Sequence, residues 1–400
     1  MSTDYYIGFI KLSHFSVKEY LISCYIQDHN VTQIRNFSFS EELSHSVISQ
    51  SCLAYLLQFH TSEPFDINVD VSFPLAKYAA QNWIKHSQSG SKTKSLTSSE
   101  FALMMRLLTK ENTAFVSWVQ LCDIDDDNCL NLQKQRAEIA KPLYYAIIAG
   151  LTEGSYALLE MGADVNAQGG KYRNALQAAS HKGHKAVAKL LIEKGADVNA
   201  KGGYYGNALQ VASHNGHEAI VKLLMEKGAD IYTHIGRYGN ALQAASSKGH
   251  EAIVKLLIDK GADVNAQGEY YRNALYVASW AGHEAVVKLL IEKGADVNAQ
   301  EGYYGNALYA ALCMGHEAIA KLLIEKGADI INAQTVNYQN AMVASSSCIG
   351  HEEMKKLLVD RGRCKFTERL LTSNAIGTTL GHESFGKLLH RHSKCAERSV

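Results

Sequence analysis

A 33-residue period constrains this chain more than any other feature of its sequence. Five asparagines follow one another at this interval: Asn174, Asn207, Asn240, Asn273 and Asn306. A Gly-His pair, first at 183 and 184, and a Gly-Ala-Asp triplet, first at 195 to 197, recur at the same interval. Three sequence features that recur at one interval indicate a chain built from a repeated supersecondary unit.

The residue pattern of each unit predicts two helices followed by a polar loop. Asn207 occupies the N-cap position of a short helix, which Gly216 ends. His217 opens a longer helix with an apolar stripe, and Gly228 follows it as a left-handed C-cap. The glycine-bearing stretch between one unit and the next is suited to a protruding hairpin.

The pattern GHxxxVxxLLxxGAD within such a unit closely resembles the ankyrin repeat. This resemblance implies an all-α solenoid that binds a protein partner on its concave face. Where the usual unit reads Thr-Pro-Leu-His, this chain reads Asn-Ala-Leu-Gln at 174–177, 207–210 and 240–243. Gln keeps a side-chain amide where His would form a hydrogen bond. Tyr276 and Tyr309 carry no such amide.

The resemblance extends over residues 141–362, and we expect an array of about seven repeats in 141–364. The first unit, at 141–162, is divergent, as a terminal repeat with one neighbour is expected to be. The register shifts by one residue near Ile331. We expect residues 365–400 to form a degenerate capping repeat and a tail.

The first 140 residues do not follow the period. We expect a strand and then a helix within residues 5–25, where SVKE is a capping-box pattern. Helices are also predicted at 40–59, 74–86, 99–109 and 112–121, with Pro74 at the first position of its helix.

The stretches LSHFSVKEYLIS, SQSCLAYLL and PLAKYAAQNWIKH resemble the segment that joins a NACHT-type nucleotide-switch ATPase to ankyrin repeats in fungal signalling proteins. The resemblance implies a winged-helix-like remnant at 1–26 and a helical linker domain at 27–140. The chain has no GxxxxGK[ST] phosphate loop and no Walker-type acidic strand, so we expect no nucleotide hydrolysis and no cofactor.

Composition favours a protein as the partner. Forty basic and forty acidic residues cancel, so no overall field attracts nucleic acid or a membrane. The eight cysteines form no CxxC pair, and no stretch of eighteen apolar residues is present. We expect an intracellular protein, in the cytoplasm or the nucleus, with reduced thiols and with a monomer favoured.

Three patterns resemble chemical sites and fail on spacing. DIDDDN at 123–128 begins like a calcium loop, but Asn128 and Lys134 stand where Gly and Glu are required, so we expect a solvated acidic turn. The repeated His-Glu lacks the second His of HExxH, so these histidines are expected to bond local backbone. His390, His392 and Cys395 lack a fourth ligand. We therefore predict neither a metal site nor catalytic residues.

Differences among repeats indicate where a partner binds. The leucine two residues after each Asn never changes, which assigns it to the core. The position near the end of the first helix does change: His181, His214, Ser247, Trp280 and Cys313. Trp280 is either an interface anchor or a ring lying flat on a neighbouring repeat.

The hairpins carry two adjacent positions with different predicted roles. The second position is always tyrosine, which predicts a structural ladder in which each ring packs on the next loop: Tyr172, Tyr205, Tyr238, Tyr271, Tyr304 and Tyr338. The first position varies, which favours contact with a partner: Lys171, Tyr204, Arg237, Tyr270 and Tyr303. Arg173 and Arg272 replace Gly206, so we expect no glycine-only backbone there.

Two functions remain open on the sequence. The first is a non-catalytic scaffold that captures a protein on the concave face, with His181, His214 and Trp280 among its contacts. The alternative is a truncated or regulatory fragment of a NACHT-type switch protein that acts in trans.

Overall fold

The computed structural model describes nine segments of the chain: 41–59, 72–89, 98–109, 113–126, 130–202, 206–237, 239–268, 273–299 and 306–328. Within them the chain is all-α, with sixteen helices and no strand, which confirms the expected fold class. The strand and helix expected within 5–25, the shifted register near Ile331 and the capping repeat at 365–400 lie outside the described residues.

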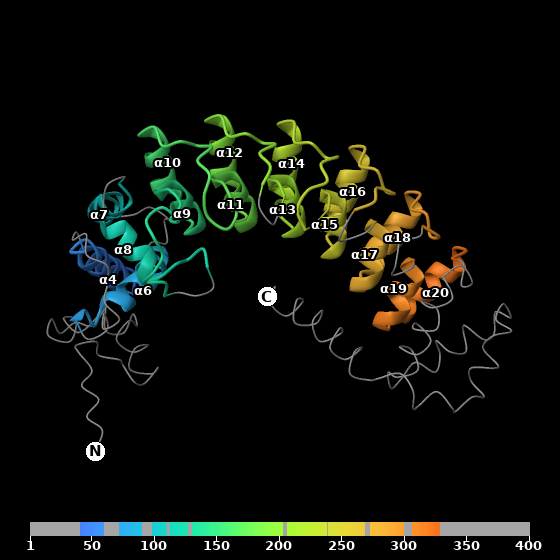
Figure 1. Ribbon diagram of the computed structural model, residues 1–400, viewed down its shortest axis with the longest axis horizontal. Coiled ribbons are helices and arrows are strands. Elements are labelled where there is room, and N and C mark those ends of the chain that lie inside the picture. Colours follow the sequence, from blue (N-terminus) through green and yellow to red (C-terminus); the bar gives the residue numbers. More distant parts are fainter. Residues whose placement is uncertain are drawn as a thin grey trace, which may run out of the picture. The chain divides into compact units, whose positions relative to one another are not determined.

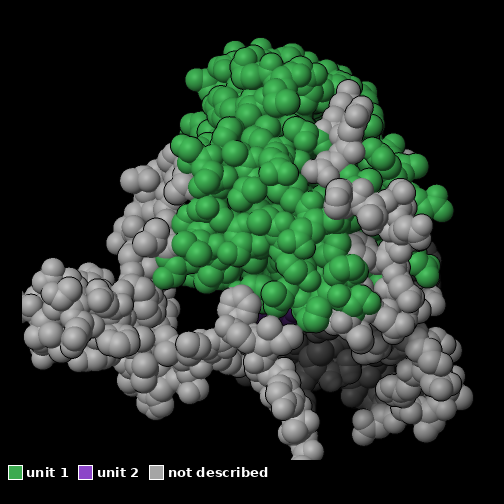
Figure 2. All heavy atoms as spheres, turned by 90° about the vertical axis from the view of Figure 1, so that its left-hand side faces the viewer, with its two compact units in different colours: residues 1–245, 252–262 green, residues 246–251, 263–400 purple. Residues whose placement is uncertain are grey.

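The chain divides into two compact units, of which unit 1 faces the viewer in Figure 2. Unit 1 comprises residues 1–245 and 252–262, and unit 2 comprises 246–251 and 263–400. The division falls inside the array, at α15 (Ala241–Ser247) and α16 (Glu251–Asp259). The domain boundaries expected at 26, 140 and 364 remain predictions.

Four helices precede the array in unit 1: α4 (Glu41–Leu56), α6 (Ala76–Ser89), α7 (Ser98–Leu108) and α8 (Thr113–Leu121). They confirm the four predicted helices, although α6 begins two residues after Pro74. Trp83 and Trp118 are fully buried between them, edge to face with ring centroids 5.4 Å apart. Trp118 also donates its indole N–H to the Ala80 carbonyl at 3.2 Å, so this core is both packed and hydrogen-bonded.

The array consists of helix pairs. Unit 1 contains α9 (Pro142–Ile148), α10 (Thr152–Glu160), α11 (Ala175–Lys182), α12 (Lys185–Glu193), α13 (Ala208–His214) and α14 (Glu218–Glu226). Unit 2 contains α17 (Ala274–Ala281), α18 (Glu284–Glu292), α19 (Ala307–Met314) and α20 (Glu317–Glu325). The first helix of each pair is called the inner helix here, and the second the outer helix. In Figure 1, the inner helices α9, α11 and α13 form one row of unit 1, and α10, α12 and α14 form the other.

Asparagine N-caps account for where the inner helices begin. Asn174 Oδ1 accepts the Gln177 N–H at 2.8 Å, and Asn207 with Gln210 forms a reciprocal capping box. The five leucines predicted to be core are at most 2% exposed: Leu176, Leu209, Leu242, Leu275 and Leu308. Both predictions are confirmed.

The Gln side chains also bridge consecutive repeats of unit 1. Gln177 Nε2 donates to the Gly206 carbonyl at 2.8 Å, and Gln210 Nε2 donates to the Ile235 carbonyl at 3.0 Å. Each amide therefore ties an inner helix to the following hairpin, which satisfies loop carbonyls that are withdrawn from water. The predicted role of Gln as a substitute for His is confirmed at these two positions.

His217, His283 and His316 bond backbone of the preceding repeat, so the expectation that such histidines bond local backbone was wrong for these three. His217 Nε2 lies 2.9 Å from the carbonyl oxygen of His181, 36 residues earlier, at the end of the preceding inner helix. In unit 2, His316 makes the same contact with the Trp280 carbonyl at 3.1 Å. A Cβ on Gly183 would lie 2.6 Å from the His217 ring, so the Gly-His pair recurs because the glycine makes room for the next repeat's histidine.

A second bridge joins the loops at the outer ends of the repeats. Asn199 Nδ2 donates to the Gly228 carbonyl at 3.0 Å, and its Oδ1 accepts the Asp230 N–H at 2.8 Å. Asn166 in unit 1 and Asn265 in unit 2 make the same pair of bonds. Tyr232 stands at the equivalent position of its own repeat and is 61% exposed. The amide bridge is therefore replaced by an exposed aromatic ring at this repeat.

The hairpin backbone is left-handed at the position where Arg replaces Gly. Gly206 has φ +89°, Gly239 has φ +70° and Arg173 has φ +73°. Arg173 adopts this left-handed conformation, which L residues disfavour by about 1–2 kcal/mol, so the expectation of no glycine-only backbone holds at position 173. At Gly206 a Cβ would also overlap the Gln210 side chain, so the capping box requires glycine there.

The amide bridge predicts unequal costs at two equivalent positions. Asn199→Ala removes two inter-repeat hydrogen bonds, so we expect the free energy of unfolding to fall by about 1–2 kcal/mol. Tyr232→Ala is the matched control, and we expect a change within about 0.5 kcal/mol because the ring is largely exposed. Urea denaturation of both variants measures the difference. Equal losses in the two variants would show that the amide bridge contributes nothing.

Candidate partner-binding surface

The candidate surface, called the binding face here, consists of the hairpin loops and inner helices. Its portion in unit 1 is the described part of 165–182, 198–215 and 231–245, and its portion in unit 2 is the described part of 264–281 and 297–314. The stacking contacts above hold the backbone of these segments and leave their tips and helix ends partly exposed. These tips and ends are where the sequence varies from repeat to repeat.

His181 is fixed in place by an aromatic stack. Its ring lies 4.3 Å from that of Tyr172, nearly parallel at 26°. Tyr172 is only 6% exposed. The ring of this ladder tyrosine therefore packs on the inner helix of its own repeat, whereas the predicted contact was with the next loop.

The protonation state of His181 follows from its neighbours. Asn215 Nδ2 lies 3.1 Å from His181 Nδ1, which makes Nδ1 an acceptor in a neutral ring. Burial, followed by the positive charge of Lys182, lowers the pKa of His181 from 6.5 to about 4. His181 therefore presents a neutral, half-buried imidazole at neutral pH.

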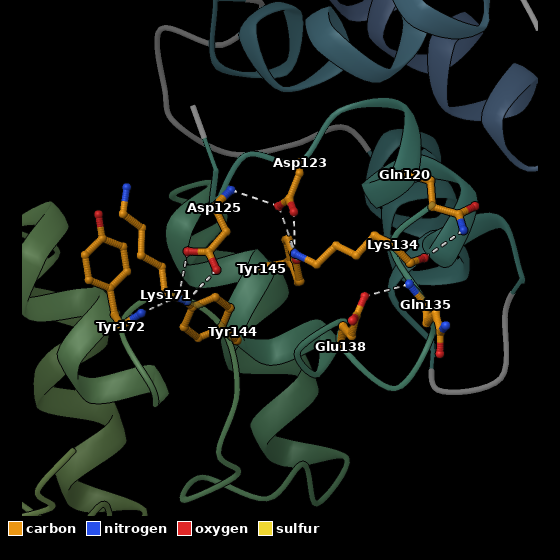
Figure 3. A network of polar contacts seen from close by, with 10 residues as sticks. All are labelled: Gln120, Asp123, Asp125, Lys134, Gln135, Glu138, Tyr144, Tyr145, Lys171 and Tyr172. Atoms are coloured by element: carbon orange, nitrogen blue, oxygen red, sulfur yellow. Dashed lines mark hydrogen bonds and ion pairs between the residues drawn. The ribbon is translucent and has the colours of Figure 1, made fainter. Parts of the chain in front are cut away.

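The first hairpin is anchored from beneath by a buried acidic residue (Figure 3). Asp125 Oδ2 accepts the Lys171 N–H at 2.6 Å, and Asp125 Oδ1 accepts the Tyr144 hydroxyl at 2.7 Å. The Tyr144 oxygen in turn accepts the Tyr172 N–H at 3.0 Å. Burial, followed by the negative charge of Asp125, raises the pKa of the Tyr144 hydroxyl, so it stays protonated and donates to the carboxylate.

A second carboxylate, Asp123, lies beside the first and is completely buried. It forms an ion pair with Lys134, and its Oδ1 accepts the Tyr145 hydroxyl at 3.2 Å (Figure 3). The expectation of a solvated acidic turn at 123–128 was therefore wrong for Asp123 and Asp125. Lys134, which cannot serve as a calcium ligand, supplies the positive charge that permits burial of Asp123.

Unit 2 presents an aromatic pair on its portion of the binding face. The Trp280 ring stacks on Tyr276 at 17° with centroids 6.4 Å apart, and Tyr276 is 8% exposed. Trp280 itself is half-buried, and its carbonyl accepts the His316 bond described above. Trp280 thus has one ring face supported by Tyr276 of its own helix, and it lies beside the exposed Ala281.

The remaining predicted contacts are distributed as follows. Lys171 is exposed at its hairpin tip, and Arg237 and His214 are half-buried. Eight of the predicted contact and ladder tyrosines lie outside the described residues. They are Tyr204, Tyr270, Tyr303, Tyr205, Tyr238, Tyr271, Tyr304 and Tyr338. Their roles stay predictions.

Sequence reasoning missed exposed cations on the same face: Arg173, Lys182 and Lys201. A charge count restricted to the hairpin and inner-helix segments would have found them, because the net charge of the whole chain conceals their arrangement. It also missed Tyr232, which alignment with Asn166 and Asn199 would have shown to be out of pattern.

Two other kinds of feature are absent from the described part of the chain. In the segments that the structure describes, no group of three His, Cys, Asp or Glu side chains is arranged to hold a metal ion. The helices in those segments also include none that is both long and apolar enough to cross a bilayer.

The stacked helix pairs with bridging loops define a helix-turn-helix repeat array. A model of ankyrin repeats in three copies matches residues 143–235 and 209–301, and a model of ankyrin repeats in many copies matches 281–324. These residues are therefore ankyrin repeats, as the resemblance implied.

Two known proteins are similar over part of the chain. The azaphilone pigments biosynthesis cluster protein L of Monascus ruber is 37% identical over 193 residues, which is 45% of this chain and 40% of that protein. The chain thus matches less than half the length of this relative. The crystal structure of the human ASB11 ankyrin repeat domain aligns at 24% identity and a TM-score of 0.45, covering 51% of this chain and 97% of that one.

The buried ion pair predicts a large cost for removing one partner. Asp123→Ala leaves Lys134 without its carboxylate, so we expect the free energy of unfolding to fall by about 3–5 kcal/mol. Glu138→Ala is the control, because Glu138 accepts only an exposed bond from the Gln135 N–H at 2.9 Å. Chemical denaturation compares the two, and similar small losses would contradict a structural role for Asp123.

The lowered pKa of His181 predicts sensitivity to acid. The unfolded chain binds a proton near pH 6.5 and the folded chain only near pH 4, so stability is lost as the pH falls through this window. His181→Phe keeps a ring against Tyr172 and removes the titration. We expect a smaller loss of unfolding free energy between pH 7 and pH 5 in this variant, measured by urea denaturation. An unchanged loss would assign the acid sensitivity to other groups.

Proposed function

We propose that this chain is a non-catalytic protein-protein interaction scaffold, whose ankyrin repeats capture a protein partner on the binding face. In this proposal the chain works as a monomer in the cytoplasm or nucleus and needs no cofactor. Ankyrin repeats support the scaffold role in general. The identity of the residues that touch the partner is part of the proposal: Lys171, Tyr204, Arg237, Tyr270, Tyr303, Trp280, His181 and His214.

One observation carries the proposal: in the five repeats that begin at Asn174, Asn207, Asn240, Asn273 and Asn306, one position near the end of the inner helix is partly exposed, and only two of these repeats share the same residue there. The five side chains are those of His181, His214, Ser247, Trp280 and Cys313. The leucine five residues before each of them is buried and never changes. A position that stacking leaves free to vary is available to read a partner.

Prior ordering of these side chains also favours binding. His181 is stacked on Tyr172, and Trp280 is stacked on Tyr276. A ring that is already held in one rotamer loses less conformational entropy when a partner covers it. Both residues therefore suit the role of interface anchors.

The polar groups that resemble chemical machinery have structural partners instead. His217, His283 and His316 contact backbone carbonyls of the preceding repeat. The described aspartates of the Gly-Ala-Asp triplets accept backbone N–H groups of their own loops, as Asp197 does from Asn199 at 2.9 Å. This use of both residue types supports a non-catalytic role.

The resemblance of residues 12–23 to a NACHT-linked segment supports a second candidate. In this alternative the chain is a truncated or regulatory fragment that docks on a NACHT-type switch protein in trans. Val47 and Phe73 favour it, because these apolar side chains are 54% and 42% exposed in the helical region that carries the resemblance. The genomic sequence upstream discriminates the candidates: an in-frame P-loop favours the switch fragment, and a stop codon with a separate promoter favours the free-standing scaffold.

Affinity purification of the tagged full chain with mass spectrometry tests the scaffold proposal. We expect Trp280→Ala combined with Tyr270→Ala to reduce capture of the recovered partner by about tenfold or more, since aromatic anchors commonly contribute over 1 kcal/mol each. The melting temperature should change little. Tyr156→Ala is the control, because Tyr156 is 43% exposed on the outer helix α10. Unchanged capture with a lower melting temperature would make Trp280 a stacking residue.

A further inference from the structure

The three segments that form the unit 1 portion of the binding face contain no acidic residue. Over 165–182, 198–215 and 231–245 they carry five Lys or Arg residues: Lys171, Arg173, Lys182, Lys201 and Arg237. The equivalent segments of unit 2, 264–281 and 297–314, carry Glu269, Arg272 and Glu301. The charge of the binding face therefore depends on the repeat, although the whole chain is neutral.

The five cations of unit 1, called the cationic face here, lie at the surface. Lys171, Arg173, Lys182 and Lys201 are exposed, and Arg237 is half-buried. Arg173 reaches toward the next hairpin, because its Nε lies 3.4 Å from the place where a Cβ on Gly202 would be. It therefore brings its charge next to Lys201, across the boundary between two repeats.

Two titrating groups respond to these charges. The pKa of His181 is lowered by Lys182 and Lys171 in addition to burial. The pKa of Asp230 is lowered mainly by its bonds to Thr233 and Tyr232, and further by Lys201 and His234. The positive charges thus gather around the inner-helix end and the loops of unit 1.

Apart from the buried Asp125 beneath Lys171, the carboxylates beside the cationic face are spaced along it and already accept hydrogen bonds. Asp164, Asp197 and Asp230 lie one to a repeat, just before the segments of the cationic face, and each accepts a backbone N–H of its own loop at 2.9–3.0 Å. The outer helices carry mixed charges, as in the Lys189–Glu193 pair at 3.7 Å. The cationic face therefore differs from the outer helix α12, where positive and negative side chains lie together.

We propose that the cationic face of unit 1 binds an extended acidic segment of a partner protein, which lies along the row of hairpins. This deepens the scaffold proposal and rests on it. Neighbouring helices pack about 8–10 Å apart, and an extended peptide rises about 3.3 Å per residue. A segment with Asp or Glu at every third residue therefore matches one cationic hairpin per repeat.

An acidic peptide fits this face better than a nucleic acid does. Nucleic-acid sites have a continuous basic surface and stacking aromatic rings. Here one aspartate interrupts the positive charge in each repeat, and Tyr172 is already stacked on His181. The carboxylates of a peptide are separate and can lie between these aspartates. The phosphate backbone of a nucleic acid is continuous and would have to pass close to each aspartate.

Fluorescence anisotropy of the full chain with a labelled peptide tests the proposal. The probe has about nine residues with Glu at every third position, and its counterpart has Gln at the same positions. We expect binding of the Glu peptide alone, weakened when salt rises from about 50 to about 200 mM. Equal binding of the two peptides would overturn the proposal, as would tighter binding of a labelled single-stranded oligonucleotide.

Paired charge reversals locate the binding. Lys171→Glu with Lys201→Glu should weaken binding of the Glu peptide about tenfold. Lys185→Glu with Lys189→Glu makes the same change of charge on the outer helix α12 and should leave binding within about twofold. Equal losses in both variants would show that general charge, rather than this face, attracts the peptide.

Arg173→Gly separates binding from stability. It removes a charge of the cationic face and relieves the left-handed backbone, so we expect weaker peptide binding together with a higher melting temperature. Unchanged binding would remove Arg173 from the face. If the unsubstituted chain did not bind the Glu peptide but still captured its partner, only the acidic-segment proposal would be overturned, because capture through Trp280 in unit 2 is measured separately.

Discussion

The structure depends on hydrogen bonds that each repeat makes to backbone groups of its neighbour. Gln177 reaches forward to the Gly206 carbonyl, Asn199 reaches forward to Gly228 and Asp230, and His217 reaches back to the His181 carbonyl. Helix ends and loops leave backbone groups without partners inside their own element, and burial of such groups is costly. These side chains satisfy those groups and fix the register between repeats, which explains why Asn, Gln and His recur at fixed positions in most repeats, as leucine does in all of them.

Periodicity predicted the array well because the same contacts recur. The N-cap at Asn174, the buried Leu209 and the amide role of Gln210 follow from spacing and residue type alone. Spacing within one repeat could not show that the His217 bond crosses to the preceding repeat, because the partner is a backbone carbonyl, which leaves no trace in the residue pattern. The left-handed backbone at Arg173 could not be predicted either, because arginine disfavours this conformation and its presence in the sequence does not indicate it.

The buried carboxylates lie outside the repeats, so the sequence offers no equivalent positions with which they can be compared. Asp123 and Asp125 fall between the four leading helices and the array, and their partners, Lys134 and Tyr144, lie 11 and 19 residues further on. A run of acidic residues with a distant lysine has no local signal of burial. Tyr144 and Tyr145 of α9 donate to these carboxylates, so the groups that permit their burial come from later in the chain.

On the binding face, the residues that stack the repeats are different from the residues that are available to a partner. Residues that stack the repeats are uncharged and alike, so charge and aromatic side chains on this face are free to differ between units. Unit 1 carries the cations and a neutral His181, while unit 2 carries Trp280 on its Tyr276 support. An interface gains speed and selectivity from charge and affinity from buried aromatic anchors. A partner that has both an acidic segment and an apolar pocket would therefore use each unit for a different part of recognition.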